Sequence, residues 1–418
     1  VGMADSIMVA NVGEAAVSGV SLVDQIMVLL INIFAALATG GAVVAGQYLG
    51  QKNKEQACKS TTQLMWSMGF ISLVITAFVY ACKYWILHGV FGQIEADVMH
   101  HADVYLLIVT ASIPFIALYN GGAAVFRAMG NSEVSMKVSL LMNAINVSGN
   151  AILIYGFHCG TEGVAIPTLV SRFVAAFIII KLLLKDKWTL HLKRTFRFNP
   201  DWSMIRKILS VGIPNGLENS MFQLGKLAIQ STVSTLGTTA IAAQAMTNIL
   251  ENLNGMAAIG IGVGLMTIVG QCMGADRKDE AVYYIKKLSV IAEVAIIVSC
   301  LLVFALTGPV TVLGGMEPAS AKMCFHMVIW ITIVKPIVWT LAFVPAYGLR
   351  AAGDVKFSMI TSCLVMWLCR FCLCVILIRF LGFGPMGVWI GMFADWTVRA
   401  VIFTWRFHSR RWLRYKVI

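Results

Sequence analysis

An internal repeat constrains this chain more than any other feature of its sequence. The block GQYLGQKNKEQA at residues 46–57 returns 224 positions later as GQCMGADRKDEA at residues 270–281, with five identities in twelve positions. RAMGN from Arg127 likewise matches RAAGD from Arg350, and GVAI matches GVWI, at the same spacing to within one residue. Because three anchors stay in register, the sequence predicts a duplicated fold with two copies of one arrangement.

Composition indicates that lipid is the solvent for most of this fold. The chain is 59% hydrophobic and only 12% charged, whereas soluble domains carry about 25% charged residues. Apolar runs long enough to cross a hydrocarbon core of about 30 Å recur throughout. We therefore expect an all-α membrane protein with twelve transmembrane helices in two parallel six-helix lobes, the first helix being truncated. The predicted spans lie near residues 1–10, 18–48, 60–85, 101–128, 134–157, 162–184, 203–235, 240–273, 281–307, 322–350, 356–381 and 386–408.

The longest polar stretch falls midway between the repeated anchors. It predicts an N-lobe at residues 1–184, a cytoplasmic linker at 185–202, a C-lobe at 203–408 and a cytoplasmic tail at 409–418. Six helices return the chain to its starting side, so the two copies should be parallel and enclose a cleft.

The net charge of +12 is distributed as in a membrane protein rather than a nucleic-acid-binding protein. Most of the 32 Lys and Arg residues fall at one side of the predicted spans, and only Lys83, Lys322 and Arg379 fall on the other. Positively charged loops stay in the cytoplasm. We therefore expect a multi-pass protein of the inner (plasma) membrane with both termini cytoplasmic, and no nucleic-acid partner.

No enzymatic or metal-binding motif stands out. The cluster Cys369, Cys372 and Cys374 lacks a second ligand pair at a spacing typical of zinc. No nucleophile motif or phosphate-binding loop occurs in the sequence context that such a motif requires. We expect no catalytic residues, no bound metal and no cofactor.

Polar residues recur at helical spacing inside three predicted spans. Such faces should point inward, because polar groups against lipid are unfavourable. Hydrogen bonding between neighbouring helices is the alternative explanation for each amide. The candidates for lining an internal cavity are Asp24, Asn143, Asn219, Gln223, Lys226, Gln244 and Asn248.

Ionisable residues within the spans are stronger candidates for a functional role than the neutral amides. Asp5 and Glu251 have no opposite charge three or four residues away in their own helices. A carboxyl group sheltered from water can take a proton on one side and release it on the other. Asp395 and Arg399, four residues apart, fit a structural ion pair instead.

Several segments together resemble one family. GMADSIMV at residues 2–9 resembles the first-helix motif of the multidrug and toxic compound extrusion (MATE) transporters. GQYLGQKNKEQA and FRAMGNS are similar to the ends of their second and fourth helices, and GIP at 212–214 to the start of their seventh. The resemblance covers the whole chain.

The resemblance implies two lobes that export small drug-like compounds across the lipid bilayer by alternating access, coupled to inward movement of H⁺ or Na⁺. It implies an N-lobe cation site at Asp5, Asn146, Asn150 and Thr168. Asn150 stands where the family has a carboxylate, which puts coupling through this lobe in question.

In the C-lobe, the candidates for coupling or substrate binding are Glu218, Glu251, Arg370 and Asp395. We expect a monomer. Two other interpretations stay open: a lipid-linked precursor flippase of the same superfamily, and a membrane protein that does not transport.

Overall fold

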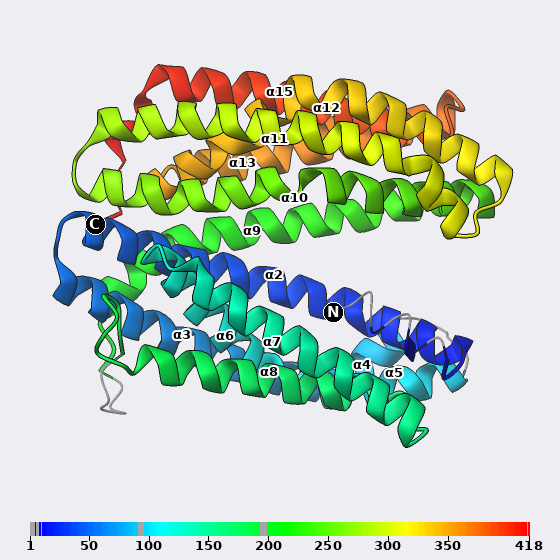
Figure 1. Cartoon of the computed structure of the whole chain (residues 1–418), viewed down its shortest axis with the longest axis horizontal. Helices are drawn as coiled ribbons and strands as arrows, with labels where there is room; N and C mark the ends of the chain where they lie inside the picture. Colours follow the sequence, from blue (N-terminus) through cyan, green and yellow to red (C-terminus); the bar gives the residue numbers. More distant parts are fainter. Residues whose placement is uncertain (1–4, 6–7, 10, 91–95, 193–198, 416) are drawn as a thin grey trace. The chain divides into compact units, whose positions relative to one another are not determined.

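The computed structural model describes residues 5, 8–9, 11–90, 96–192, 199–415 and 417–418, and every secondary-structure element within them is a helix (Figure 1). The longer helices of the first half are α2 (Glu14–Gly50), α3 (Lys54–Ala81), α5 (Ala96–Thr110), α6 (Ile113–Ala128), α7 (Ser132–Ala151) and α8 (Glu162–Leu183). Those of the second half are α9 (Trp202–Val233), α10 (Thr238–Gly274), α11 (Lys278–Leu313), α12 (Pro318–Ala352), α13 (Val355–Val365) and α15 (Met386–Ser409).

Short helical segments join or extend these helices. The α-helical segments are α4 (Lys83–Trp85) and α14 (Leu373–Val375), the π-helical segments are η1 (Ile86–Val90), η2 (Ile152–Gly156), η4 (Met366–Cys372) and η5 (Ile376–Phe380), and the 3₁₀ segments are η3 (Ser234–Leu236) and η6 (Arg411–Arg414).

The chain divides into two compact units. The first contains residues 1–46 and 53–216, and the second contains residues 47–52 and 217–418. The division falls within α9. The lobe boundaries expected at residues 184 and 203 stay a prediction.

Within the described residues, nine helices are long and apolar enough to cross a membrane. Helices α5 and α6 are bent by 48° relative to each other, and the number of candidate spans is ten if this pair counts as one broken span. Of the remaining two predicted spans, the first falls largely outside the described residues. The other is α9, which has 32 residues but carries a polar face. The all-helical membrane fold expected from composition is therefore confirmed.

The duplication is visible in the backbone. Left-handed residues occur in pairs at the repeat spacing: Lys52 (φ 61°) with Asp276 (φ 59°), and His158 (φ 53°) with Gly382 (φ 67°). The π-helical segments η2 and η5 begin at equivalent positions, as do α2 and α10, α3 and α11, and α8 and α15. Since non-glycine residues seldom adopt positive φ, their recurrence shows that the repeat preserves turn geometry even where side chains differ.

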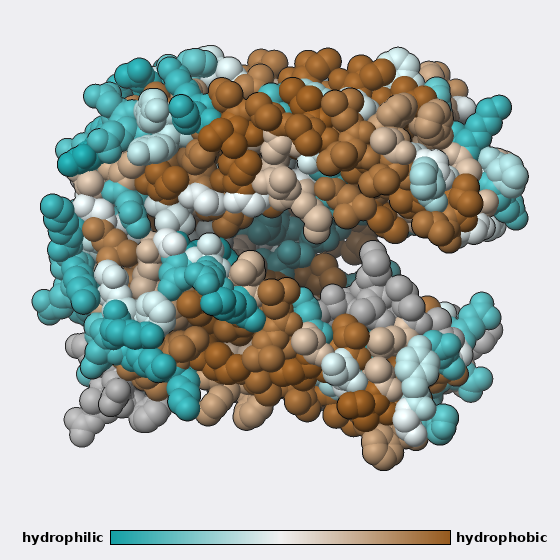
Figure 2. All heavy atoms as spheres, viewed as in Figure 1, coloured by the Kyte–Doolittle hydropathy of each residue, from teal (hydrophilic) through white to brown (hydrophobic). Residues whose placement is uncertain are grey.

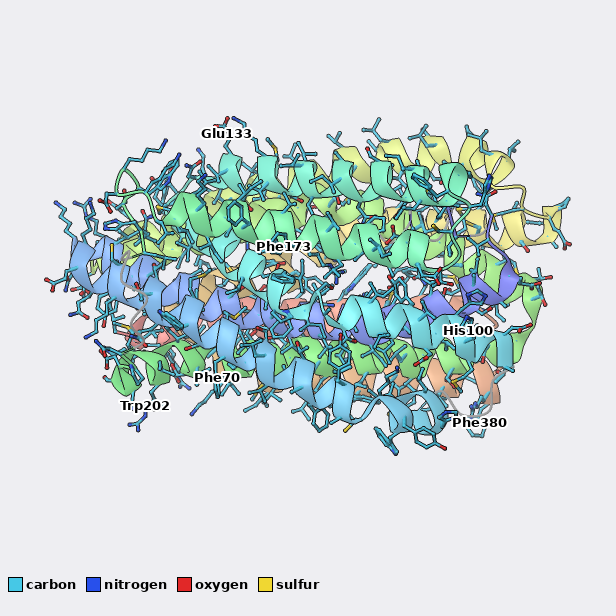
Figure 3. The ribbon with its side chains drawn as sticks, turned by 90° about the horizontal axis from the view of Figure 1, so that it is seen from below. Phe70, His100, Glu133, Phe173, Trp202 and Phe380 are labelled. Atoms are coloured by element: carbon cyan, nitrogen blue, oxygen red, sulfur yellow. The ribbon has the colours of Figure 1, made fainter. Side chains whose placement is uncertain are left out.

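Apolar side chains cover the lipid-facing sides of the helices. In the second unit, hydrophobic residues cover the middle of the helices and hydrophilic residues gather at their ends (Figure 2). In the first unit, Phe70 on α3 and Phe173 on α8 are 68% and 50% exposed (Figure 3). This distribution matches a protein surrounded by hydrocarbon, where apolar exposure carries no penalty.

The C-terminal end of the predicted linker is held against α3 by polar contacts. Lys59 lies 2.7 Å from the Asp201 carboxylate, and this hydrogen bond lowers the pKa of Asp201. Gln63 donates to the carbonyl of Asn199 (2.8 Å) and accepts from the amide of Asp201 (3.3 Å). These contacts fix the start of α9 within the first unit. Residues 193–198 of the linker lie outside the described part.

Candidate functional site

A buried polar cluster in the first unit contains the residues expected at the N-lobe cation site. Asp5 is 2% exposed and accepts a hydrogen bond of 2.5 Å from Asn150 Nδ2. Asn146 Nδ2, one helical turn earlier on α7, donates to Thr168 Oγ1 on α8 (3.3 Å). Thr168 itself donates to the carbonyl of Val164 (2.9 Å). The helical spacing of the two asparagines thus brings all four predicted residues into one neighbourhood.

The oxygen atoms of this cluster suit a hard cation. The side-chain oxygens of Asn146 and Asn150 are buried and have no hydrogen-bond partner among the described residues. Carboxylate and amide oxygens are the ligands that hard cations prefer. Asn150 therefore supplies an oxygen donor but no charge, and Asp5 is the acidic member of the set.

A second carboxylate lies in the same unit. Asp24 on α2 accepts from the Tyr105 hydroxyl on α5 (2.8 Å). Arg172 on α8 donates to Ser112 at the bend between α5 and α6 (2.7 Å) and interacts electrostatically with both Asp24 and Asp5. Sequence reasoning included neither Tyr105 nor Arg172 among the candidate site residues.

The second unit contains a cavity of about 550 Å³, called the C-lobe cavity below. Its volume lies within the roughly 300–1,000 Å³ typical of small-molecule sites. All its lining residues come from helices α9 to α15 and their connections. They include Glu218, Asn219, Phe222, Gln223, Lys226, Gln244, Asn248, Glu251, Lys335, Trp339, Phe343, Tyr347, Arg350, Ser362, Arg370, Trp396 and Arg399.

Glu251 on this wall has a partner from another helix. Lys335 on α12, whose side chain is 1% exposed, lies 2.8 Å from the Glu251 carboxylate on α10. Lys335 also donates to the backbone carbonyl of Glu251 (3.1 Å) and to the side chain of Asn254. Glu251 therefore has no opposite charge in its own helix, as its spacing indicates, but it is neutralised across the helix interface.

The predicted ion pair between Asp395 and Arg399 is present, at 3.1 Å. Arg370 joins it from the π-helical segment η4 and lies 2.6 Å from the other Asp395 oxygen. Asp395 is fully buried, and Arg370 and Arg399 are 2% and 3% exposed. Two guanidinium groups thus share one carboxylate. A Cβ added at Gly391 would lie 2.8 Å from the Arg370 carbonyl, so the close approach of α15 depends on that glycine.

A hydrogen-bonded chain extends this triad to Glu218. Arg399 donates to Ser362 Oγ (2.9 Å), and Ser362 donates to Glu218 (2.9 Å). Glu218 also forms an ion pair with Arg350 (2.9 Å). Arg350 is a site residue that sequence reasoning noted only as part of a repeated motif.

The structure separates the predicted cavity-lining residues into two groups. Asn219, Gln223, Lys226, Gln244 and Asn248 are on the wall of the C-lobe cavity, whereas Asp24 and Asn143 belong to the first unit. Glu218, Glu251 and Arg370 are also on this wall, and Asp395 is directly behind it as the partner of Arg370. Their roles in binding or coupling remain proposals.

In the described part of the chain, no group of three or more His, Cys, Asp or Glu side chains is placed to hold a metal ion. Cys369, Cys372 and Cys374 are free thiols.

Comparison with known proteins identifies the family. A family profile described as MatE matches residues 1–152 and 214–376. The chain belongs to the MATE family. This MATE-family chain is 27% identical to the uncharacterized transporter YisQ of Bacillus subtilis, over 99% of this chain and 91% of that protein. It is 25% identical to the probable multidrug resistance protein NorM of Thermotoga maritima, over 100% of this chain and 90% of that protein.

Solved structures show the same fold. A crystal structure of MATE in complex with MaL6 superposes with a TM-score of 0.88 at 19% identity, covering 98% of this chain and 91% of that chain. An outward-facing multidrug resistance MATE family transporter of the MOP superfamily gives a TM-score of 0.85 at 19% identity, covering 99% and 92%. Membership of the MATE family makes the protein a multi-pass membrane transporter, as the sequence resemblance indicated, and this family is not one of enzymes.

Proposed function

We propose that this protein is a secondary active antiporter that exports small amphiphilic, drug-like compounds by alternating access. Inward movement of H⁺ or Na⁺ drives the export. The protein acts as a monomer in the plasma membrane, with both termini in the cytoplasm. The names of its relatives, which include probable multidrug resistance proteins, support the substrate class.

The buried Asp5 carboxylate carries the coupling part of this proposal. Asp5 is 2% exposed, accepts from a neutral amide and forms no ion pair with a described residue. An unpaired carboxylate in a transmembrane segment has a large free-energy cost, and such a residue is by default a candidate for a functional role. Binding of H⁺ or Na⁺ removes its charge and so favours one arrangement of the transporter over another.

Gradient-driven export from reconstituted vesicles tests the proposal. Asp5→Asn should abolish export of a fluorescent dye driven by an imposed proton or sodium gradient, at equal protein per vesicle. Asp97→Asn, an exposed change in the first turn of α5, is the matched control and should leave export unchanged. Normal export by Asp5→Asn would contradict coupling at this cluster, and the gradient that drives the wild type identifies the ion.

Glu251 is the corresponding candidate in the C-lobe, but its test needs a second variant. Glu251→Gln alone leaves Lys335 buried without its counter-ion, which is destabilising by itself. The double variant Glu251→Gln with Lys335→Met removes both charges. Unaltered transport by this double variant would remove the pair from the coupling mechanism.

A lipid-linked precursor flippase is the second candidate function. The observation that favours it is the excess of cationic over acidic side chains around the C-lobe cavity. Movement of a fluorescent phosphate-linked lipid between leaflets, without dye export, would select this function over the first.

A further inference from the structure

The C-lobe cavity carries an excess of positive charge. Five cationic side chains are on its wall: Lys226, Lys335, Arg350, Arg370 and Arg399. Three acids offset part of this charge: Glu218 and Glu251 are on the wall, and Asp395 is buried behind it. The net charge of this group is therefore +2, inside a unit surrounded by lipid.

The excess can be assigned to particular residues. Lys335 is neutralised by Glu251, and Arg350 by Glu218. Arg370 and Arg399 share Asp395, so that one guanidinium charge is left without a carboxylate of its own. The Nε atoms of both arginines are buried and have no partner among the described residues. Lys226 forms no ion pair with any described residue.

The two sources of excess charge meet at one aromatic ring. Lys226 Nζ lies 4.6 Å from the centroid of the Phe222 ring, and the Arg370 guanidinium lies 5.2 Å from the same centroid. The two cations act on each other electrostatically. Like charges that lie close together repel each other, so an anion between them would be stabilised by both.

Aromatic side chains provide a place for an apolar body next to these cations. Trp339 and Phe343 of α12 and Trp396 of α15 are on the wall together with Phe222. Sites with apolar aromatic walls and a few placed polar groups are typical of small-molecule pockets.

We propose that the C-lobe cavity binds the anionic group of an amphiphilic ligand, a carboxylate, sulfonate or phosphate, between Lys226 and Arg370. The aromatic wall then takes the apolar part of the ligand. This inference rests on the proposed export function and specifies its substrate class. Of the two cations, Lys226 is the better residue to substitute, because its side chain is solvent-accessible and is not part of the buried Asp395 triad.

Equilibrium binding to the purified full chain in phosphatidylcholine nanodiscs tests the proposal without any ion gradient. Two probes share one fluorophore and differ in charge: dansylglycine is anionic and dansylcadaverine is cationic. Binding is measured by energy transfer from tryptophan, with empty nanodiscs subtracted. Dansylglycine should bind at least tenfold more tightly, since a hydrogen bond to a charged group contributes about 1.5–3 kcal/mol and 1.4 kcal/mol is tenfold in affinity.

Three variants locate the effect. Lys226→Gln should weaken dansylglycine binding about tenfold, and Lys226→Glu should reverse the preference towards dansylcadaverine. Lys287→Gln, an exposed change on α11 outside the cavity, is the matched control and should leave both affinities unchanged. Equal binding of the two probes by the wild type, or an anion preference retained by Lys226→Glu, would overturn the proposal.

A competition arm distinguishes the sources of the anionic group. Phosphatidic acid in the nanodiscs should displace dansylglycine from the wild type if the ligand is a lipid headgroup, and should leave it bound if the ligand is a soluble amphiphile. Failure of the function is separable from failure of this inference. Anion-selective binding without gradient-driven export would overturn only the proposed function, whereas export without anion preference in binding would overturn only the inference.

Discussion

Replacing Asp395 with Asn tests how the buried charges of the second unit are held. Asn has nearly the same shape but no charge, so it leaves the packing of α15 intact while removing the counter-ion of Arg370 and Arg399. Asp395 is fully buried and lies 2.6 Å and 3.1 Å from the two guanidinium groups. The variant therefore leaves two buried cations without a carboxylate.

The expected cost follows from these contacts. Removing one partner of a buried ion pair costs about 3–5 kcal/mol, because the remaining charge stays buried without compensation. For a unit of this size, each kcal/mol lowers the unfolding midpoint by about 2–4 °C. The midpoint of Asp395→Asn should therefore fall by roughly 6–20 °C.

Size-exclusion chromatography of the purified protein after heating measures this midpoint. Glu133→Gln is the matched control, because Glu133 forms an exposed surface pair with Lys137 and its loss should not shift the curve. The double variant Asp395→Asn with Arg370→Gln removes one of the stranded cations and should recover part of the loss. A drop no larger than that of Glu133→Gln would refute the reasoning that Asp395 balances two buried charges.

Two further changes address packing and hydrogen bonding. Gly391→Ala should destabilise the protein by about 1–3 kcal/mol, because the new methyl group would lie 2.8 Å from the Arg370 carbonyl. Gly69→Ala on α3, whose nearest neighbour would be a leucine methyl at 3.7 Å, should be tolerated in the same heating assay. Tyr105→Phe removes the hydroxyl that donates to Asp24 and should cost about 1–3 kcal/mol, since it leaves a carboxylate without its donor. An unchanged midpoint for either Gly391→Ala or Tyr105→Phe would contradict the corresponding contact.

Much of the fold could be predicted from the sequence because its causes are local. Apolar runs of sufficient length predict spans, and the repeat predicts that turns recur, as Lys52 and Asp276 do. The pair Asp395 and Arg399 was predictable for the same reason, since residues four apart on a helix are neighbours. The π-helical segments had no such signal.

Contacts between helices could not be derived in this way. Lys335 is 84 residues from Glu251, and Arg370 is 25 residues from Asp395. The spacing of polar residues along one helix does not show which face of another helix they contact. The N-lobe set came from the family resemblance instead, and only the structure shows that Asn150 donates to Asp5.

The two halves have the same backbone turns, but their interior side chains differ. Asp24 of the first copy corresponds to Asn248 of the second, Thr168 to Met392, and Asn146 falls beside Arg370. The two halves thus share their turn geometry but differ in interior chemistry, with an acidic cluster in one half and a basic pocket in the other. Exchanging turn segments between the halves should therefore preserve the architecture, whereas exchanging interior helices would move the interior charge of one half into the other.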